Sequence, residues 1–197
     1  MRLLLTGGSG ILGRALRRRL SGTGIDLWAP GREELDITDG DACRRAVLDF
    51  RPDCLIHAAA WTRVDDCEAD PARAMEVNGE ATGRLARACR EAGARLLYIS
   101  TDYVFDGRGG SPYREEDPPG PINAYGRSKL RGEELVGKIL GDSLIIRTSW
   151  LYGHGGRNFV DTIAQRAASG ERLRVVDDQR GSPTYAGDLA GALAGLL

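Results

Sequence analysis

The chain has 197 residues, the length of one generous domain in the usual range of about 100–200 residues per domain. Its 27 basic and 28 acidic residues leave a net charge of −1, so neither nucleic acid nor a membrane surface is an expected partner. No apolar run approaches the ~20 residues of a membrane span, and the first one is too short for a signal peptide. The four cysteines form no Cys-x-x-Cys pair, which suits reduced thiols and a cytoplasmic protein.

Short apolar runs alternate with longer helical patterns along the chain. We expect strands over residues 2–6, 25–29, 53–58, 95–100, 143–148 and 172–176. We expect helices over residues 10–20, 41–50, 71–92, 123–140, 158–168 and 185–197. Residues 106–121 contain four Pro and four Gly and are predicted to form a loop. This alternation predicts an α/β, Rossmann-like, doubly wound parallel sheet of at least six strands with helices on both faces.

A glycine-rich turn follows the first expected strand. Gly7, Gly10 and Gly13 are spaced three residues apart, and the first expected helix, over residues 10–20, begins within this turn. A tight turn without Cβ atoms lets the backbone approach a pyrophosphate, and a helix N-terminus offers free N–H groups to the phosphates. A glycine turn without a ligand is the alternative, but the position between a strand and a helix favours nucleotide binding.

The residues after the second expected strand bear on the choice of cofactor. An arginine at this place accommodates the 2′-phosphate of NADP, whereas an acidic residue favours NAD. Arg32 comes first and favours NADPH. Glu33 and Glu34 follow and could accept ribose hydroxyls, so NADH remains possible, and Arg32 could also be an ordinary solvated arginine.

A tyrosine and a lysine lie four residues apart on the helix expected after the proline-rich loop. Tyr125 and Lys129 therefore share one helical face and can point into one pocket. The chain has only two lysines, Lys129 and Lys138, against 25 arginines, so this spacing is improbable by chance. A neighbouring ammonium lowers the pKa of a tyrosine toward a value useful for proton transfer. The pair predicts a catalytic role rather than an ordinary surface pair.

Seven motifs in order along the chain carry a resemblance to a known family. The chain resembles the dTDP-4-dehydrorhamnose reductase family, in the extended, sugar-nucleotide-modifying branch of the short-chain dehydrogenase/reductase superfamily. The motifs are Thr6-Gly-Gly-Ser-Gly-Ile-Leu-Gly13, Leu35-Asp-Ile-Thr-Asp39, Ala58-Ala-Ala-Trp-Thr62, Ser100-Thr-Asp-Tyr-Val-Phe-Asp-Gly107, Tyr125-Gly-Arg-Ser-Lys129, Arg147-Thr-Ser-Trp-Leu-Tyr-Gly153 and Asp178-Gln-Arg-Gly-Ser-Pro-Thr184.

The resemblance implies an activity and a set of cofactor contacts. Hydride would pass from NADPH to the 4-keto carbon of dTDP-4-dehydro-6-deoxy-L-mannose and give dTDP-L-rhamnose. Trp61 differs from the tyrosine or histidine usual at its position, which leaves its role open. The residues expected to bind the cofactor are Gly7, Gly10, Ile11, Leu12, Gly13, Arg32, Asp36, Ile37, Ala59, Ala60, Trp61, Tyr125 and Lys129.

The resemblance also implies catalytic and substrate-binding roles. Tyr125 would donate the proton to the developing alkoxide, and Lys129 would hold the nicotinamide ribose. Thr101 would hydrogen-bond the substrate carbonyl or the tyrosine hydroxyl. Asp102 would contact the sugar, and Trp150 would lie against the sugar nucleotide unless it is a core residue. No metal ligand is expected within the chain.

Family members continue well beyond residue 197, with a smaller C-terminal part that closes over the sugar nucleotide. We therefore expect an NAD(P)-binding domain over residues 1–150, and over 151–197 the beginning of a substrate-binding part that is largely missing and interleaved with the last sheet strand. A homodimer, with Mg²⁺ at its interface, is a further family expectation. Two alternatives stay open: a reductase of another nucleotide-linked keto-sugar, and a non-catalytic NADP-binding regulatory subunit like that of methionine adenosyltransferase.

Overall fold

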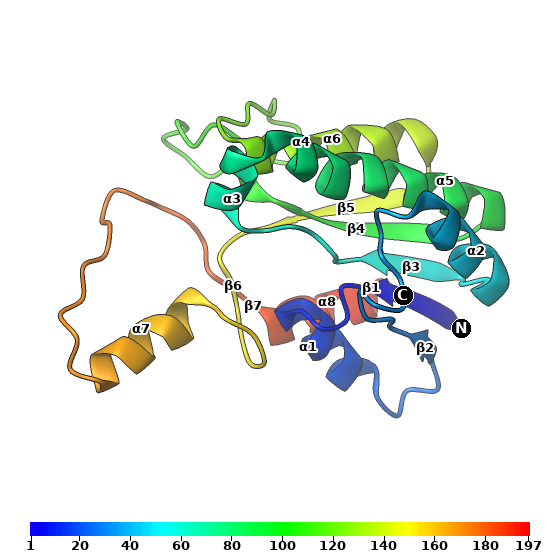
Figure 1. The fold of residues 1–197 in the computed structure, drawn as a ribbon, viewed down its shortest axis with the longest axis horizontal. Coiled ribbons are helices and arrows are strands. Elements are labelled where there is room, and N and C mark those ends of the chain that lie inside the picture. Colours follow the sequence, from blue (N-terminus) through cyan, green and yellow to red (C-terminus); the bar gives the residue numbers. More distant parts are fainter.

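Five parallel strands form the central sheet of the computed structural model, which describes residues 1–197 (Figure 1). They run in the order β2-β1-β3-β4-β5. Their bounds are β1 Arg2–Thr6, β2 Asp26–Trp28, β3 Cys54–His57, β4 Arg95–Thr101 and β5 Ser143–Thr148. From β1 the chain crosses to β2 on one side and then to β3 on the other. This reversal leaves a crevice at the carboxyl ends of the strands, where open α/β sheets bind ligands.

Helices cover both faces of this sheet, as predicted. Helices α1 (Ile11–Leu20) and α8 (Ala186–Gly195) pack together beneath it in the view of Figure 1. Helices α2 (Gly40–Phe50), α5 (Ala81–Ala92) and α6 (Ala124–Ile139) cover the opposite face. Successive side chains of a strand point to opposite faces, and the central strands β1, β3 and β4 are therefore apolar on both. None of the helices combines the length and the apolarity that crossing a bilayer requires.

The helix expected over residues 71–92 forms, but with a different geometry in its middle. It consists of α4 (Pro71–Ala74), a π-helical turn η1 (Met75–Glu80) and α5. Asp70 caps its start by accepting a hydrogen bond from the Arg73 amide at 3.0 Å. The sequence did not predict the short helix α3 (Val64–Ala69) before it or the 3₁₀ turn η2 (Asp102–Val104) after β4. A π-helical turn inside a longer helix is frequent at functional sites.

The sixth strand expected over residues 172–176 is absent, and this prediction was wrong. The segment has no regular structure, and Val175 and Val176 are exposed. A strand needs a neighbouring strand for its backbone hydrogen bonds, and none lies beside this segment. Instead, β6 (Leu151–Tyr152) and β7 (Thr184–Tyr185) pair in a separate two-stranded sheet, and α7 (Phe159–Ala168) lies between them in sequence.

Candidate active site

The glycine turn between β1 and α1 is tightly packed against the neighbouring backbone. Gly7 has φ +75°, and a Cβ atom there would lie 2.6 Å from the backbone nitrogen of Ala59. A Cβ atom on Gly13 would lie 2.2 Å from the Gly7 carbonyl oxygen. Both distances are far below van der Waals contact, so only glycine fits either position. The turn therefore brings β1, β3 and the start of α1 together at the backbone level.

The N-terminus of α1 has no side-chain cap. Its N-cap residue is Gly10, whereas α2, α6 and α7 are each capped by the side chain of an Asp or Asn residue. The first N–H groups of any α-helix have no partner within the helix, and they carry the positive end of the helix dipole. In α1 these donors are left available beside the glycine turn. Such an arrangement binds phosphate groups in other proteins.

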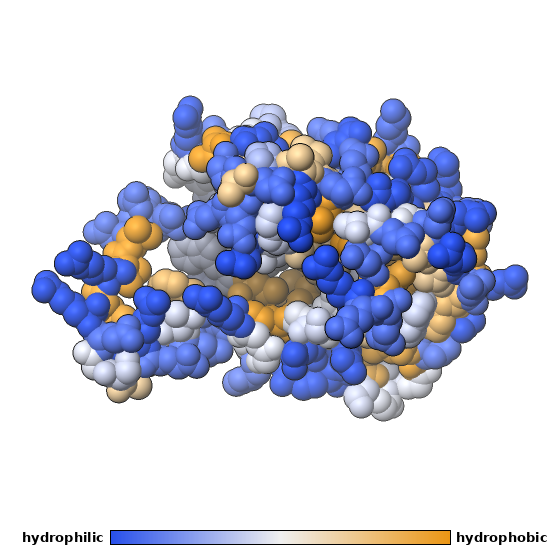
Figure 2. Space-filling view, viewed as in Figure 1, coloured by the Kyte–Doolittle hydropathy of each residue, from blue (hydrophilic) through white to orange (hydrophobic).

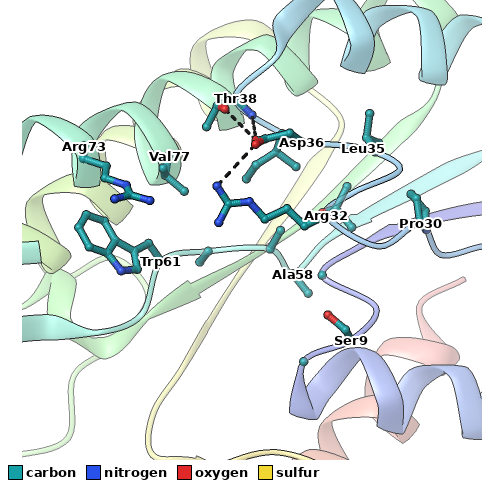
Figure 3. A pocket seen from close by; sticks show the side chains of 16 residues that line it. Ser9, Pro30, Arg32, Leu35, Asp36, Thr38, Ala58, Trp61, Arg73 and Val77 are labelled. Carbon is teal, nitrogen blue, oxygen red and sulfur yellow. Dashed lines mark hydrogen bonds and ion pairs between the residues drawn. The ribbon is translucent and has the colours of Figure 1, made fainter. Parts of the chain in front are cut away.

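A cavity of about 330 Å³ opens at this turn, at the carboxyl ends of β1 and β3. Figure 3 shows the Arg32 side chain extending into it, with Asp36 on one side and Trp61 beside Arg73 across the space. Eight of the residues expected to bind the cofactor line this cavity: Gly7, Gly10, Arg32, Asp36, Ile37, Ala59, Ala60 and Trp61. The crevice predicted from the strand order is therefore the place where these residues meet.

The Arg32 side of the cavity carries one basic and one acidic side chain, whereas Glu33 and Glu34 are not part of its lining. The Arg32 guanidinium lies 3.5 Å from an Asp36 carboxylate oxygen, and its side chain is 75% exposed. The Thr38 amide and hydroxyl both donate to Asp36, at 2.9 and 2.7 Å. These hydrogen bonds are the main cause of a lowered pKa at Asp36, and Arg32 adds to it. An ionised carboxylate fixed by Thr38 and an exposed guanidinium thus face the same space.

The opposite wall contains lining residues that sequence reasoning missed. The Arg73 guanidinium lies 4.9 Å from the centre of the Trp61 ring, a cation–π contact. Val77 follows one turn later, on the same helical face as Arg73. Asn78 holds the Trp61 backbone by accepting from its N–H at 2.8 Å and donating to its C=O at 3.0 Å. Only the four-residue spacing of Arg73 and Val77 hinted at a shared face.

Tyr125 lies with Thr101 and Asp102 at the carboxyl end of β4. Tyr125 lies in the first turn of α6 and is 8% exposed, and Thr101 is 5% exposed. The Thr101 hydroxyl donates to the Asp102 carboxylate at 3.1 Å and accepts from the Tyr103 amide at 3.2 Å. The Tyr103 ring packs edge-on against Tyr125, with centroids 5.7 Å apart. The Thr101 hydroxyl and the Tyr125 side chain are thereby held at one end of the sheet.

The structure corrects the expected effect of Lys129 on Tyr125. Burial raises the pKa of Tyr125 above its usual range, and the Thr101 hydroxyl only partly offsets this. Asp102 raises it further, and Lys129 is not among the groups that shift it. The physical reason is that desolvation penalises the phenolate more strongly than the nearby groups stabilise it. The side chain therefore keeps its proton at neutral pH.

Lys129 lies one turn further along α6 and is 2% exposed. Its Nζ donates to the Ile99 carbonyl oxygen at 2.7 Å and lies 4.1 Å from the centre of the Tyr98 ring. Burial lowers the pKa of Lys129 to about 7, and the charge of Glu133 acts in the opposite direction. The expected pair on one helical face is present, with the ammonium directed toward the backbone of β4.

Several predicted site residues lie outside the cavity lining. Leu12 belongs to the core beneath the sheet, so it could contact a ligand only through its backbone. Ile11 packs beside Gly156, where a Cβ atom would approach its side chain to 2.5 Å. Trp150 is 43% exposed with φ 46°, and its ring lies against Gly181. The structure does not bring Trp150 to the cavity.

The histidines and the acidic residues form no metal site. No three side chains of His, Cys, Asp or Glu converge closely enough to hold a metal ion. His57 is fully buried between the hydroxyls of Thr6 at 2.7 Å and Thr82 at 3.0 Å. Burial, with Lys129 nearby, lowers its pKa to about 3. A neutral histidine enclosed in this way is part of the core.

The sheet order, the glycine turn and the cavity at the strand crossover define the class of nucleotide-binding, doubly wound α/β proteins. Within this class, the family described as "RmlD substrate binding domain" matches residues 1–197, and the chain belongs to that family.

Individual relatives are longer than this chain. It is 52% identical to a dTDP-4-dehydrorhamnose reductase of Streptomyces griseus, over 99% of this chain and 64% of the relative. It is 44% identical to a dTDP-4-keto-6-deoxy-D-glucose reductase of Streptomyces niveus, over 100% of this chain and 68% of that relative. The crystal structure of dTDP-4-dehydrorhamnose reductase from Bacillus anthracis in complex with NADP superposes on this chain with a TM-score of 0.96. The two are 40% identical, over 99% of this chain and 70% of that protein. The chain spans about two thirds of these relatives.

Proposed function

We propose that the chain is the cofactor-binding and catalytic part of an NADPH-dependent reductase that converts the 4-keto group of dTDP-4-dehydro-6-deoxy-L-mannose to the hydroxyl of dTDP-L-rhamnose. The observation that carries this proposal is the position of Tyr125, Thr101 and Lys129 at the carboxyl end of β4, next to β3, whose own end lines the cavity together with the glycine turn of β1. The names of the relatives supply the substrate class. Residues 1–150 would bind the cofactor, and residues 151–197 would begin the substrate-binding part.

The residues present fit a dinucleotide. The uncapped N-terminus of α1 and the Cβ-free turn suit a pyrophosphate. Asp36 can accept from the adenosine ribose, while Ile37 and Val77 offer apolar surface to the adenine. The Arg32 guanidinium can bind a 2′-phosphate because its side chain is exposed and its ion pair with Asp36 is long, at 3.5 Å. This arrangement favours NADPH over NADH.

The chemistry follows from the state of the side chains. The nicotinamide, when bound, supplies the hydride to the carbonyl carbon. Tyr125 keeps its proton because it is buried, so it can act as the general acid that protonates the developing alkoxide. Thr101 can hydrogen-bond the carbonyl oxygen or the Tyr125 hydroxyl from the strand end. Lys129 would hold the ribose hydroxyls of the cofactor with a charged donor.

A direct assay tests this function. Purified chain is mixed with NADPH and dTDP-4-dehydro-6-deoxy-L-mannose, and NADPH oxidation is followed. Tyr125→Phe removes the proton donor and should lower kcat by about 10²–10⁴, with NADPH affinity retained. Tyr113→Phe, which removes a hydroxyl bonded to Asp106 in the 106–121 loop, is the matched control and should keep full activity.

The outcomes separate three possibilities. Oxidation that depends on this sugar and fails in Tyr125→Phe supports the proposal. Faster turnover of dTDP-4-keto-6-deoxy-D-glucose would favour the second candidate, which the relative from Streptomyces niveus suggests. NADPH binding by a folded sample without oxidation on any dTDP-, UDP- or GDP-linked keto-sugar would contradict a catalytic role and favour a regulatory one.

A further inference from the structure

Helix α6 carries a buried carboxylate on the same face as the expected catalytic pair. Glu133 follows Lys129 by four residues, as Lys129 follows Tyr125, so the three side chains form one row. Glu133 is only 6% exposed. A carboxylate is rarely buried without a partner, because removing its charge from water is unfavourable unless another group compensates. Proton donation by Tyr125 does not itself require Glu133.

Arg147 of β5 supplies the partner. Its Nη2 donates to Glu133 Oε2 at 2.7 Å, and its Nε donates to Oε1 at 3.1 Å, which makes a two-pronged ion pair. The guanidinium is also fixed by the Phe105 ring, 4.9 Å away, and by a hydrogen bond to the Glu115 carbonyl oxygen at 3.3 Å. Glu133 is thus held in one orientation between α6 and the edge strand of the sheet.

The surroundings of Lys129 show why this carboxylate matters. Three titratable groups contact or act on Lys129: His57 on β3, Tyr98 on β4 and Glu133 on α6. Tyr125 precedes Lys129 by one turn on the same face of α6. His57 and Tyr98 are neutral because burial lowers the pKa of the histidine and raises that of the tyrosine. Tyr125 is neutral for the same reason. Glu133 is the only anion in this set.

We propose that Glu133, oriented by Arg147, is a positioning residue that keeps Lys129 charged so that its ammonium can hold the cofactor ribose beside Tyr125. The role in cofactor binding rests on the proposed function, whereas the effect on Lys129 itself does not. Burial alone works against the charge, and Glu133 is the group that raises the pKa of Lys129. Arg147 is not among the groups that act on Lys129, which fits a role in holding the carboxylate.

The two-lysine composition allows a direct test. The chain is labelled with ¹³Cε-lysine and titrated by NMR, which gives two signals, one from Lys129 and one from exposed Lys138. Lys138→Arg assigns them. Glu133→Gln should lower the titration midpoint of Lys129 by about 1 pH unit or more, because losing a neighbouring opposite charge usually has an effect of this size. Glu134→Gln is the matched control, since Glu134 is exposed and pairs with Arg131 at 3.7 Å.

A second variant guards against unfolding. Glu133→Gln leaves the Arg147 guanidinium without its partner, and a broken buried pair is strongly destabilising. The double variant Glu133→Gln/Arg147→Gln removes both charges and should lower the Lys129 midpoint to a similar extent. A midpoint that stays at the wild-type value in either folded variant, or that moves equally in Glu134→Gln, would overturn the proposal.

The titration needs neither cofactor nor substrate, so it is independent of the proposed reductase activity. NADPH affinity of the same samples then tests the link to function. In Glu133→Gln the affinity should fall several-fold at neutral pH and recover when the pH is lowered past the new Lys129 midpoint. A lowered midpoint without NADPH binding in the wild type would support the effect of Glu133 on Lys129 and contradict the proposed function alone.

Discussion

The sheet region, residues 2–148, and the excursion, residues 149–183, differ in where their apolar side chains lie. Leu97 and Ile56 in the sheet are completely buried, whereas Phe159 and Val176 in the excursion are 65% and 67% exposed. Asn158 is the one buried residue of the excursion. Figure 2 shows apolar residues on the surface of the segment at the left that carries α7. Helix α8 then returns to pack on α1.

The excursion keeps a helix because local signals suffice to start one. The Asn158 side chain accepts from the Asp161 amide at 3.0 Å and donates to the carbonyls of Gly153 and Gly156. By contrast, the helices around the sheet bury an apolar face against it. The difference teaches that capping fixes where a helix begins, while burial decides how much it adds to stability. The residues of the cavity all come from the sheet region.

The largest expected difference between the regions is in core packing. Leu97→Ala leaves a cavity under the sheet and should lower the free energy of unfolding by about 2–5 kcal/mol. Phe159→Ala removes a larger side chain from the excursion and should change it by less than about 0.5 kcal/mol. Denaturant unfolding measures both. Equal losses would mean that the excursion is packed as firmly as the sheet.

The glycine turn of the sheet region should be far more sensitive to substitution than an exposed helix position. Gly13→Ala forces backbone atoms apart, because the new Cβ would lie 2.2 Å from the Gly7 carbonyl oxygen, and should cost about 1–3 kcal/mol or more. Gly137→Ala lies in the exposed part of α6 with open space around it and should stabilise by about 1 kcal/mol. Thermal unfolding of both variants checks the opposite signs.

The two histidines, one in each region, should differ in their effect on acid stability. Burial lowers the pKa of His57 to about 3, below its unfolded value of about 6.5. As the pH falls from 6.5 toward 3, the unfolded chain takes up this proton and the folded chain does not. Stability should therefore fall by about 1.4 kcal/mol per pH unit from this group.

Urea unfolding between pH values of about 6.5 and 3 measures how the free energy of unfolding changes with pH. His57→Gln should reduce this change by about 1.4 kcal/mol per pH unit. His154→Gln, in the exposed excursion, is the control and should leave the slope of the wild type. A slope that is the same in His57→Gln and in the wild type would show that His57 accepts its proton within the fold.

The smallest expected effect is on the choice of cofactor. Arg32→Ala should weaken NADPH binding by about tenfold, because a charged hydrogen bond to the 2′-phosphate is lost, and should leave NADH binding unchanged. Arg17→Ala, on the exposed face of α1, is the matched control. Fluorescence titration with both cofactors gives the ratio. A parallel loss for NADPH and NADH would place Arg32 at another part of the cofactor.

Local patterns in the sequence determined much of the sheet region. The apolar runs predicted all five strands of the sheet, and the three central strands β1, β3 and β4 are buried on both faces. The three-residue spacing of Gly7, Gly10 and Gly13 predicted the turn, since its close backbone contacts exclude any Cβ atom. The spacing of Tyr125 and Lys129 placed both on one helical face. These features depend on neighbours in the chain.

Tertiary structure alone decided the features that depend on distant neighbours. Residues 172–176 have the composition of a strand, but no strand lies beside them to complete their hydrogen bonds. Arg73 and Val77 line the cavity because α4 and η1 are packed across from the loop that carries Arg32. The pKa of Tyr125 is raised rather than lowered because burial outweighs the nearby groups. Periodicity and spacing act along the chain, whereas pairing, packing and desolvation depend on what the fold brings to each side chain.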